Sequence, residues 1–267
     1  MYLFHFFIYN LAGLYYITNG IYNKRSNDSV LFDDKTKLVN IPTNISNPIK
    51  IHMKNIIPFQ REAFEIIKDK FELIEDLNTI KDYEIVSIYG CVAYGCDSSM
   101  NYQSIYLFLR NLFFENMKYS VIPGKRVYIT RKNSELQHNG TLKRYIFNEN
   151  EFIESLKKFN IEFIQLEEYN TFDKIKLFME SEIIISPHSG CLTFLLFTNK
   201  KTNIIEILKN GTTGSYHNNY LDLCKDLGLQ YNRYSNINED YNGNFNMNIK
   251  DFEIFLAGFI IWKKLLY

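Results

Sequence analysis

The sequence has few of the residues that mark several common protein classes. Its 267 residues include four cysteines, five prolines and twelve glycines. Four cysteines are too few for a disulfide scaffold in a chain of this length. The shortage of proline and glycine argues against collagen-like repeats, disorder and long linkers. We therefore expect free thiols, a reducing compartment and globular domains.

Net charge and membrane signals are absent as well. Thirty Lys and Arg residues balance thirty Asp and Glu residues, which gives a formal net charge of +0. A general nucleic-acid binder needs a positive field, so we expect no nucleic-acid partner. No apolar run reaches the roughly eighteen residues of a membrane span, and the N-terminus lacks a basic segment and a cleavage signal. These absences predict a cytoplasmic protein without a membrane span.

The sequence likewise lacks the motifs that bind metals and common cofactors. Cys91 and Cys96 lie close together, but no second Cys or His pair completes a zinc site. The chain has no Walker lysine motif and no Gly-x-Gly-x-x-Gly fingerprint, which argues against a P-loop NTPase or a dinucleotide-dependent oxidoreductase. We expect neither a metal nor a cofactor.

What is present is a regular alternation of short apolar runs and amphipathic segments after Pro123 and Gly124. Asn148 and Thr171 are predicted helix caps, and Gly228 a helix stop. The predicted strands are 126–130, 161–166, 183–186, 203–208 and 230–234, and the predicted helices lie over 152–159, 172–179, 191–197 and 220–226. This order predicts an α/β fold with a right-handed, doubly wound parallel sheet.

The C-terminal segment and the first half of the chain give the remaining domain predictions. Residues 249–267 form a strongly apolar segment, predicted as a helix that packs on the sheet or across the domain boundary. The first half predicts a smaller α/β domain, with strands at 14–18, 30–32 and 84–89 and helices over 59–77 and 105–114. The domains are therefore expected at 1–122, 125–248 and 249–267.

Polar residues follow the predicted strands where a parallel sheet binds its ligands. Arg131 follows the first strand of the second half, and a Ser-Pro-His-Ser-Gly segment at 186–190 links the third strand to an apolar helix. Free amides at a helix start suit an anion, and Arg131 and His188 add charge-assisted bonds. Glu206 is the only charge in its strand, where it accepts bonds from a ribose or lies exposed at the strand end. His188 is alternatively a structural histidine.

Several stretches in one order, from Lys125 to Tyr234, resemble the family 61 glycosyltransferases. These include plant xylan transferases, animal protein O-GlcNAc transferases and microbial capsule-type proteins. The family usually shows Ile-Ser-Arg, Arg-Arg-Ile-x-Asn-Glu, Gly-Pro-His-Gly-Ala-Gly-Leu-Thr-Asn and Ile-Glu stretches in turn. The corresponding stretches here are 127–132, 144–149, 183–193 and 204–207, with 172–178 and 227–231 also in place.

The resemblance implies a GT-B architecture, with two Rossmann-like domains that face a cleft. The N-terminal domain would then be the acceptor side, and the C-terminal domain would bind the nucleotide-sugar. It also implies an inverting, metal-independent sugar transfer from a UDP-sugar to a glycan or glycoprotein acceptor. The predicted nucleotide-sugar-binding residues are Arg131, Arg144, His188, Ser189, Gly190, Cys191, Leu192, Thr193 and Glu206. Arg144 either reaches the phosphates or braces its own loop through Asn148 or Glu149.

The chain also departs from the family pattern. Ser186, Ser189, Gly190 and Cys191 stand where the family has Gly, Gly, Ala and Gly, and Phe194 stands where it has Asn. An N-terminal Asn-Tyr-x-His-x-x-x-Asp stretch is matched by residues 101–108, with Ser104 and Phe108 in place of His and Asp. No catalytic residue is therefore assigned. The alternatives are an inactive relative that binds a nucleotide-sugar or scaffolds an active transferase, and a doubly wound domain unrelated to sugars.

Overall fold

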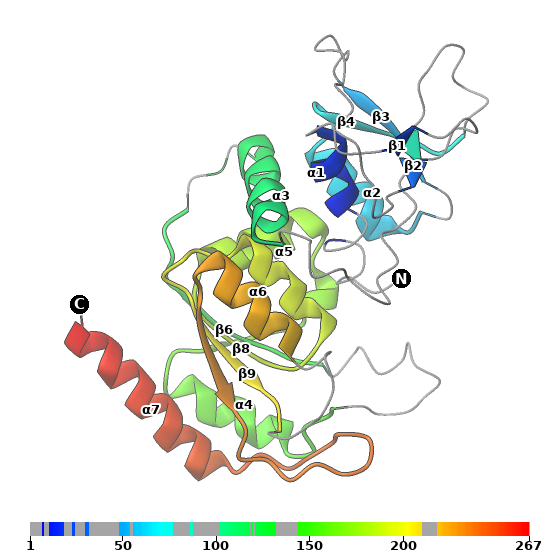
Figure 1. Ribbon diagram of the computed structural model, residues 1–267. Coiled ribbons are helices and arrows are strands. Elements are labelled where there is room, and N and C mark those ends of the chain that lie inside the picture. Colours follow the sequence, from blue (N-terminus) through cyan, green and yellow to red (C-terminus); the bar gives the residue numbers. More distant parts are fainter. Residues whose placement is uncertain are drawn as a thin grey trace. The chain divides into compact units, whose positions relative to one another are not determined.

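The structure is a computed structural model of residues 1–267 (Figure 1). It forms two compact units: unit 1 comprises residues 1–120 and 170–173, and unit 2 comprises residues 121–169 and 174–267. The structure describes residues 7, 11–18, 23–24, 30–31, 48–53, 56–76, 86–87, 102–117, 119, 121–131, 144–209 and 218–266.

Unit 2 is built on one five-stranded parallel sheet. Its strands are β6 (Lys125–Ile129), β7 (Glu162–Ile164), β8 (Ser181–Pro187), β9 (Asn203–Ile207) and β10 (Gln230–Tyr234). They lie in the order β10-β9-β8-β6-β7, and every neighbouring pair is parallel. The predicted parallel α/β sheet is therefore confirmed. The strand order reverses between β6 and β8, and such a switch point is where open α/β sheets bind ligands.

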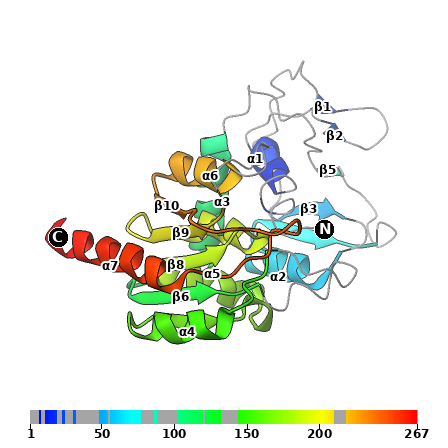
Figure 2. The same ribbon diagram turned by 90° about the horizontal axis from the view of Figure 1, so that it is seen from below.

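Helices cover both faces of this sheet (Figures 1 and 2). They are α4 (Glu149–Lys157), η4 (Leu166–Glu168), α5 (Thr171–Glu180), η5 (Gly190–Phe197), α6 (Asn219–Leu227) and α7 (Ile249–Leu266). On the α4 and α7 face, the Phe152 ring packs edge-on against Tyr128 of β6 and Phe252 of α7, at centroid distances of 5.2 and 4.9 Å. The C-terminal helix thus packs on the sheet. Within the described ranges, no helix is long and apolar enough to cross a bilayer.

Two local predictions for the helices around this sheet need correction, and a third holds for the position alone. The cap of α5 is Asn170, one residue before the predicted Thr171, because its Oδ1 accepts the Asp173 amide at 2.9 Å. The segment after β8 is a 3₁₀-helix, η5. Asn148 is the N-cap residue of α4, as predicted, although its side chain makes no capping bond. It pairs instead with the backbone of Met247, at 2.8 and 3.0 Å.

Unit 1 contains two small sheets in its described part. β1 (Asn23–Lys24) and β2 (Val30–Leu31) pair antiparallel, while β3 (Ile49–His52), β4 (Phe71–Ile74) and β5 (Val86–Ser87) form a parallel sheet in the order β4-β3-β5. The helices are α1 (Ala12–Thr18), α2 (Pro58–Ile66) and α3 (Tyr102–Met117). A second Rossmann-like domain stays a prediction.

Two sequence predictions for unit 1 are wrong. Residues 14–18 belong to helix α1, because Leu11 and Leu14 bury one helical face and the Tyr15 ring packs on Phe108 of α3 at 5.6 Å. These tertiary contacts override the strand preference of aromatic and β-branched residues. The helix expected over 59–77 ends at Ile66, because residues 71–74 form a strand that pairs with β3. The local periodicity of the sequence does not reveal this pairing.

The end of α6 gives a test of backbone strain. Gly228 adopts φ 66°, and a Cβ added there meets no atom within 4 Å. Gly228→Ala should therefore lower the free energy of unfolding by about 1–2 kcal/mol through the left-handed backbone alone. Gly258→Ala, within α7 and equally unobstructed, should instead raise it by about 0.5–1 kcal/mol. Urea unfolding of both variants checks the opposite signs.

Candidate functional site

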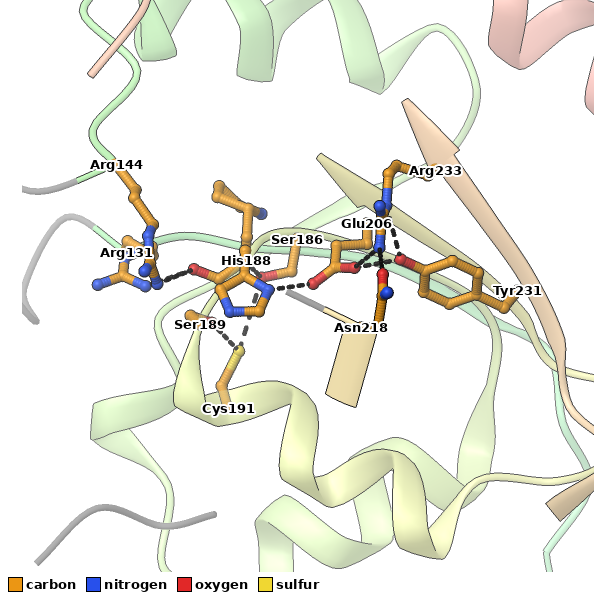
Figure 3. A network of polar contacts seen from close by, with 11 residues as sticks. Arg131, Arg144, Ser186, His188, Ser189, Cys191, Glu206, Asn218, Tyr231 and Arg233 are labelled. Carbon is orange, nitrogen blue, oxygen red and sulfur yellow. Dashed lines mark hydrogen bonds and ion pairs between the residues drawn. The ribbon is translucent and has the colours of Figure 1, made fainter. Parts of the chain in front are cut away.

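Two arginines meet over one backbone carbonyl at the switch point of the unit 2 sheet (Figure 3). Arg131 lies just beyond the end of β6, and His188 directly follows the neighbouring strand β8. Arg131 Nη1 donates to the His188 carbonyl oxygen at 2.5 Å, and Arg144 Nη1 donates to the same oxygen at 3.3 Å. Three residues that the sequence analysis selected from separate segments therefore lie together.

The electrostatics of this pair favour an anion. Burial lowers the pKa of Arg131, and the charge of Arg144 lowers it further. An arginine nevertheless stays protonated in a protein, so two positive charges are held close together with part of their hydration removed. A phosphate placed between them would relieve this repulsion and accept several charge-assisted hydrogen bonds.

The segment from Ser189 to Thr193 forms the start of η5, and most of it is buried. Thr193 Oγ1 donates to the Gly190 carbonyl at 2.8 Å, which ties the first turn together. Cys191 Sγ lies 2.7 Å from Ser189 Oγ, and burial raises the pKa of this thiol. Leu192 and Thr193 are buried, whereas Gly190 is exposed and a Cβ added there meets nothing within 4 Å. Gly190 is thus the part of the loop open to a ligand.

Glu206 lies beneath His188 and is completely buried. Its Oε1 is 2.5 Å from His188 Nδ1, and its Oε2 accepts a hydrogen bond from the Tyr231 hydroxyl. A carboxylate acceptor at this distance fits the His188 tautomer that carries its proton on Nδ1. Glu206 is therefore not exposed at the end of its strand, which was one of the two alternatives from the sequence. His188 is itself largely buried, and its ring lies 5.2 Å from that of Tyr220.

Sequence reasoning missed Tyr231 and Arg233, which complete this network. Arg233 Nε donates to the Tyr231 hydroxyl at 3.1 Å, and Arg233 Nη2 lies 3.8 Å from Glu206 Oε2. Burial and the Glu206 carboxylate raise the pKa of Tyr231, so its hydroxyl stays protonated and donates. One signal in the sequence would have found them. Both are polar residues two apart on the last strand, which in a doubly wound sheet lies beside the strand of Glu206.

The alternative role for Arg144, bracing its loop through Asn148 or Glu149, is not seen. Glu149 accepts hydrogen bonds from the Tyr128 hydroxyl and Thr130 Oγ1, both at 2.6 Å. Asn148 is paired with the Met247 backbone. The Arg144 guanidinium donates instead to the His188 carbonyl, which places it beside Arg131 at the candidate anion site.

Other residues singled out in the sequence lie elsewhere. Ser104 and Phe108 are on α3 of unit 1. Cys91 and Cys96 lie outside the described residues. In the part of the chain that the structure describes, no group of three or more His, Cys, Asp or Glu side chains gathers as metal ligands would.

Comparison with known proteins gives the family. No curated protein sequence matches the chain. The Glycosyltransferase 61 family matches residues 3–205, about three quarters of the 267 residues. The match spans Arg131, Arg144 and the 188–193 loop, and it ends one residue before Glu206. The protein belongs to glycosyltransferase family 61, a membership that implies glycosyltransferase activity.

Proposed function

We propose that the protein transfers a sugar from a UDP-sugar to a glycan or glycoprotein acceptor, with inversion and without a metal ion. The observation that carries this proposal is the convergence of Arg131 and Arg144 on the His188 carbonyl. When the acceptor oxygen attacks the anomeric carbon, negative charge develops on the departing diphosphate. Two guanidiniums already held in place stabilise that charge without reorganisation at the moment of reaction.

The rest of the proposed donor site follows from the same geometry. The diphosphate lies against the two arginines and Gly190, where the loop is open. For Glu206 we propose a positioning role in place of the ribose contact expected from the sequence. Both of its oxygens are engaged and its exposed fraction is zero, so its contribution is to fix the ring of His188 beside the site.

For the architecture we propose a GT-B arrangement, with unit 2 as the donor domain and unit 1 as the acceptor side. The parallel sheet β4-β3-β5 in unit 1 supports this proposal, because parallel strands joined by helices are the building block of a Rossmann-like domain. No general base is assigned.

A second candidate is an inactive relative that still binds the nucleotide-sugar. The observation that favours it is the pair Ser104 and Phe108 at positions where the family's His and Asp are expected. The Phe108 ring packs on Tyr15 at 5.6 Å, and a phenyl ring carries no proton for general acid–base catalysis.

One pair of measurements tests these proposals. Isothermal titration of the protein with UDP should show saturable binding, and UDP-sugars incubated with the protein should be hydrolysed to UDP. Titration with inorganic phosphate at the same ionic strength is the control for nonspecific anion binding. UDP binding without turnover of any UDP-sugar would support the inactive relative, and a protein that does not bind UDP would overturn the proposed donor site.

A further inference from the structure

The backbone of Arg144 adopts an unusual conformation. Its φ is 58°, in the left-handed region. The other residue besides glycine with a positive φ in the described part of the chain is Asn160, a residue type that tolerates this region. Both residues bring their Cβ close to the following carbonyl oxygen, but arginine lacks the short polar side chain with which Asn offsets this by a local hydrogen bond. Such strain persists only where the surroundings enforce it, and it is concentrated at functional sites.

A turn from the end of unit 2 enforces it. We call residues 240–245 the buttress turn. The Arg144 amide donates to the Asn242 carbonyl at 3.2 Å, and the Tyr145 amide donates to Asn244 Oδ1 at 2.9 Å. The Phe245 amide in turn donates to the Tyr145 carbonyl at 2.9 Å. The backbone on both sides of the Arg144 side chain is therefore bonded to this turn.

The buttress turn is itself held by several hydrogen bonds. The Asp240 carboxylate accepts the amides of Asn242 and Asn244, both at 2.8 Å, and the Asn244 side-chain amide at 3.1 Å. These hydrogen bonds, led by that from the Asn244 amide, lower the pKa of Asp240, so the carboxylate is ionised at neutral pH. The Gly243 amide donates to the Asp240 carbonyl at 3.0 Å. These hydrogen bonds fix the conformation of the turn against which Arg144 is held.

Gly243 makes the close approach to Arg144. Its φ is 78°, and a Cβ added there would lie 3.2 Å from Arg144 Cγ and 3.8 Å from the Arg144 amide nitrogen. Any side chain at position 243 would press on the stem of the arginine. The turn lies beyond residue 205, where the match to the family ends.

We propose that the buttress turn positions the second arginine of the diphosphate site. By imposing a left-handed backbone on Arg144, it directs the guanidinium to the His188 carbonyl beside Arg131. An ordinary helical or extended φ would turn the Cα–Cβ bond, and with it the side chain, in another direction. This inference rests on the proposed UDP-binding function and adds to it a residue, Gly243, that acts through Arg144 without touching the ligand.

A double-mutant cycle with UDP as the titrant tests it. Gly243→Ala should weaken UDP binding about tenfold when Arg144 is present and leave it unchanged in an Arg144→Ala background, since two residues that act as one unit are not additive. Gly228→Ala is the matched control, because Gly228 also has a positive φ, of 66°, but a Cβ there meets nothing within 4 Å. It should bind UDP as the wild type does. An equal loss from Gly243→Ala in both backgrounds would mean that the turn acts on the fold alone, and would overturn the inference.

A second comparison measures the strain without any ligand. Arg144→Gly and Arg144→Ala both remove the guanidinium, but only glycine adopts the left-handed backbone freely. The glycine variant should melt higher than the alanine variant, by roughly 2–4 °C in a chain of this size. An alanine variant that melts as high as the glycine variant would contradict strain at Arg144. If the wild type does not bind UDP, the proposed function fails; if it binds and Gly243→Ala binds as tightly, the positioning role alone fails.

Discussion

Replacing Arg131 with alanine is expected to weaken UDP binding by about 1.5–3 kcal/mol, the usual contribution of a hydrogen bond to a charged group. In the ligand-free protein the same change should shift the Tm by no more than about 2 °C. The reason is that Arg131 is partly buried beside a like charge. Arg144 remains to donate to the His188 carbonyl after the change. Isothermal titration and thermal unfolding measure the two effects separately.

Arg126 provides the matched control for Arg131. Both arginines belong to the same strand region, but Arg126 is near the opposite end of β6 and pairs with Glu182 at 2.5 Å. Arg126→Ala should leave UDP affinity unchanged. Arg131→Lys should recover only part of the affinity, because an ammonium group cannot make the paired hydrogen bonds of a guanidinium. A variant Arg131→Ala that binds UDP normally but melts far lower would show that Arg131 is a structural residue.

The meeting of Arg131 with His188 could be predicted from sequence because it depends on strand order alone. Each residue follows an apolar run, and parallel strands end at the same edge of the sheet. The order β10-β9-β8-β6-β7 places those two ends side by side. No side-chain detail is needed to expect the two residues at one edge of the sheet, and they do lie in contact there. That they bind a nucleotide-sugar stays a prediction.

The support beneath the site was beyond sequence reasoning for the opposite reason. The contact of Gly243 with Arg144 joins segments far apart in the chain and depends on a positive φ at each residue. Neither spacing nor composition indicates that an arginine will adopt a left-handed backbone. The predictions for unit 1 failed for a similar reason. Residues 71–74 form a strand because β3 lies beside them, and the local periodicity of the sequence contains no information about that partner.

Glu206→Ala is expected to have the largest effect on stability, lowering the free energy of unfolding by about 2–4 kcal/mol. The change leaves two donors, His188 Nδ1 and the Tyr231 hydroxyl, without their acceptor. Each unsatisfied buried donor costs about 1–3 kcal/mol. UDP affinity should fall as well, since the ring of His188 loses the partner that fixes its orientation. Urea unfolding gives the first effect and titration with UDP the second.

The conservative variant Glu206→Gln separates shape from charge. Its amide oxygen can still accept one hydrogen bond, but its NH₂ group must face a second donor, so stability should fall between the wild type and Glu206→Ala. Glu182→Ala is the control, because that carboxylate is partly exposed in its pair with Arg126 and should contribute no more than about 1 kcal/mol. If Glu206→Ala were as stable as Glu182→Ala and bound UDP normally, Glu206 would neither support the sheet nor orient His188.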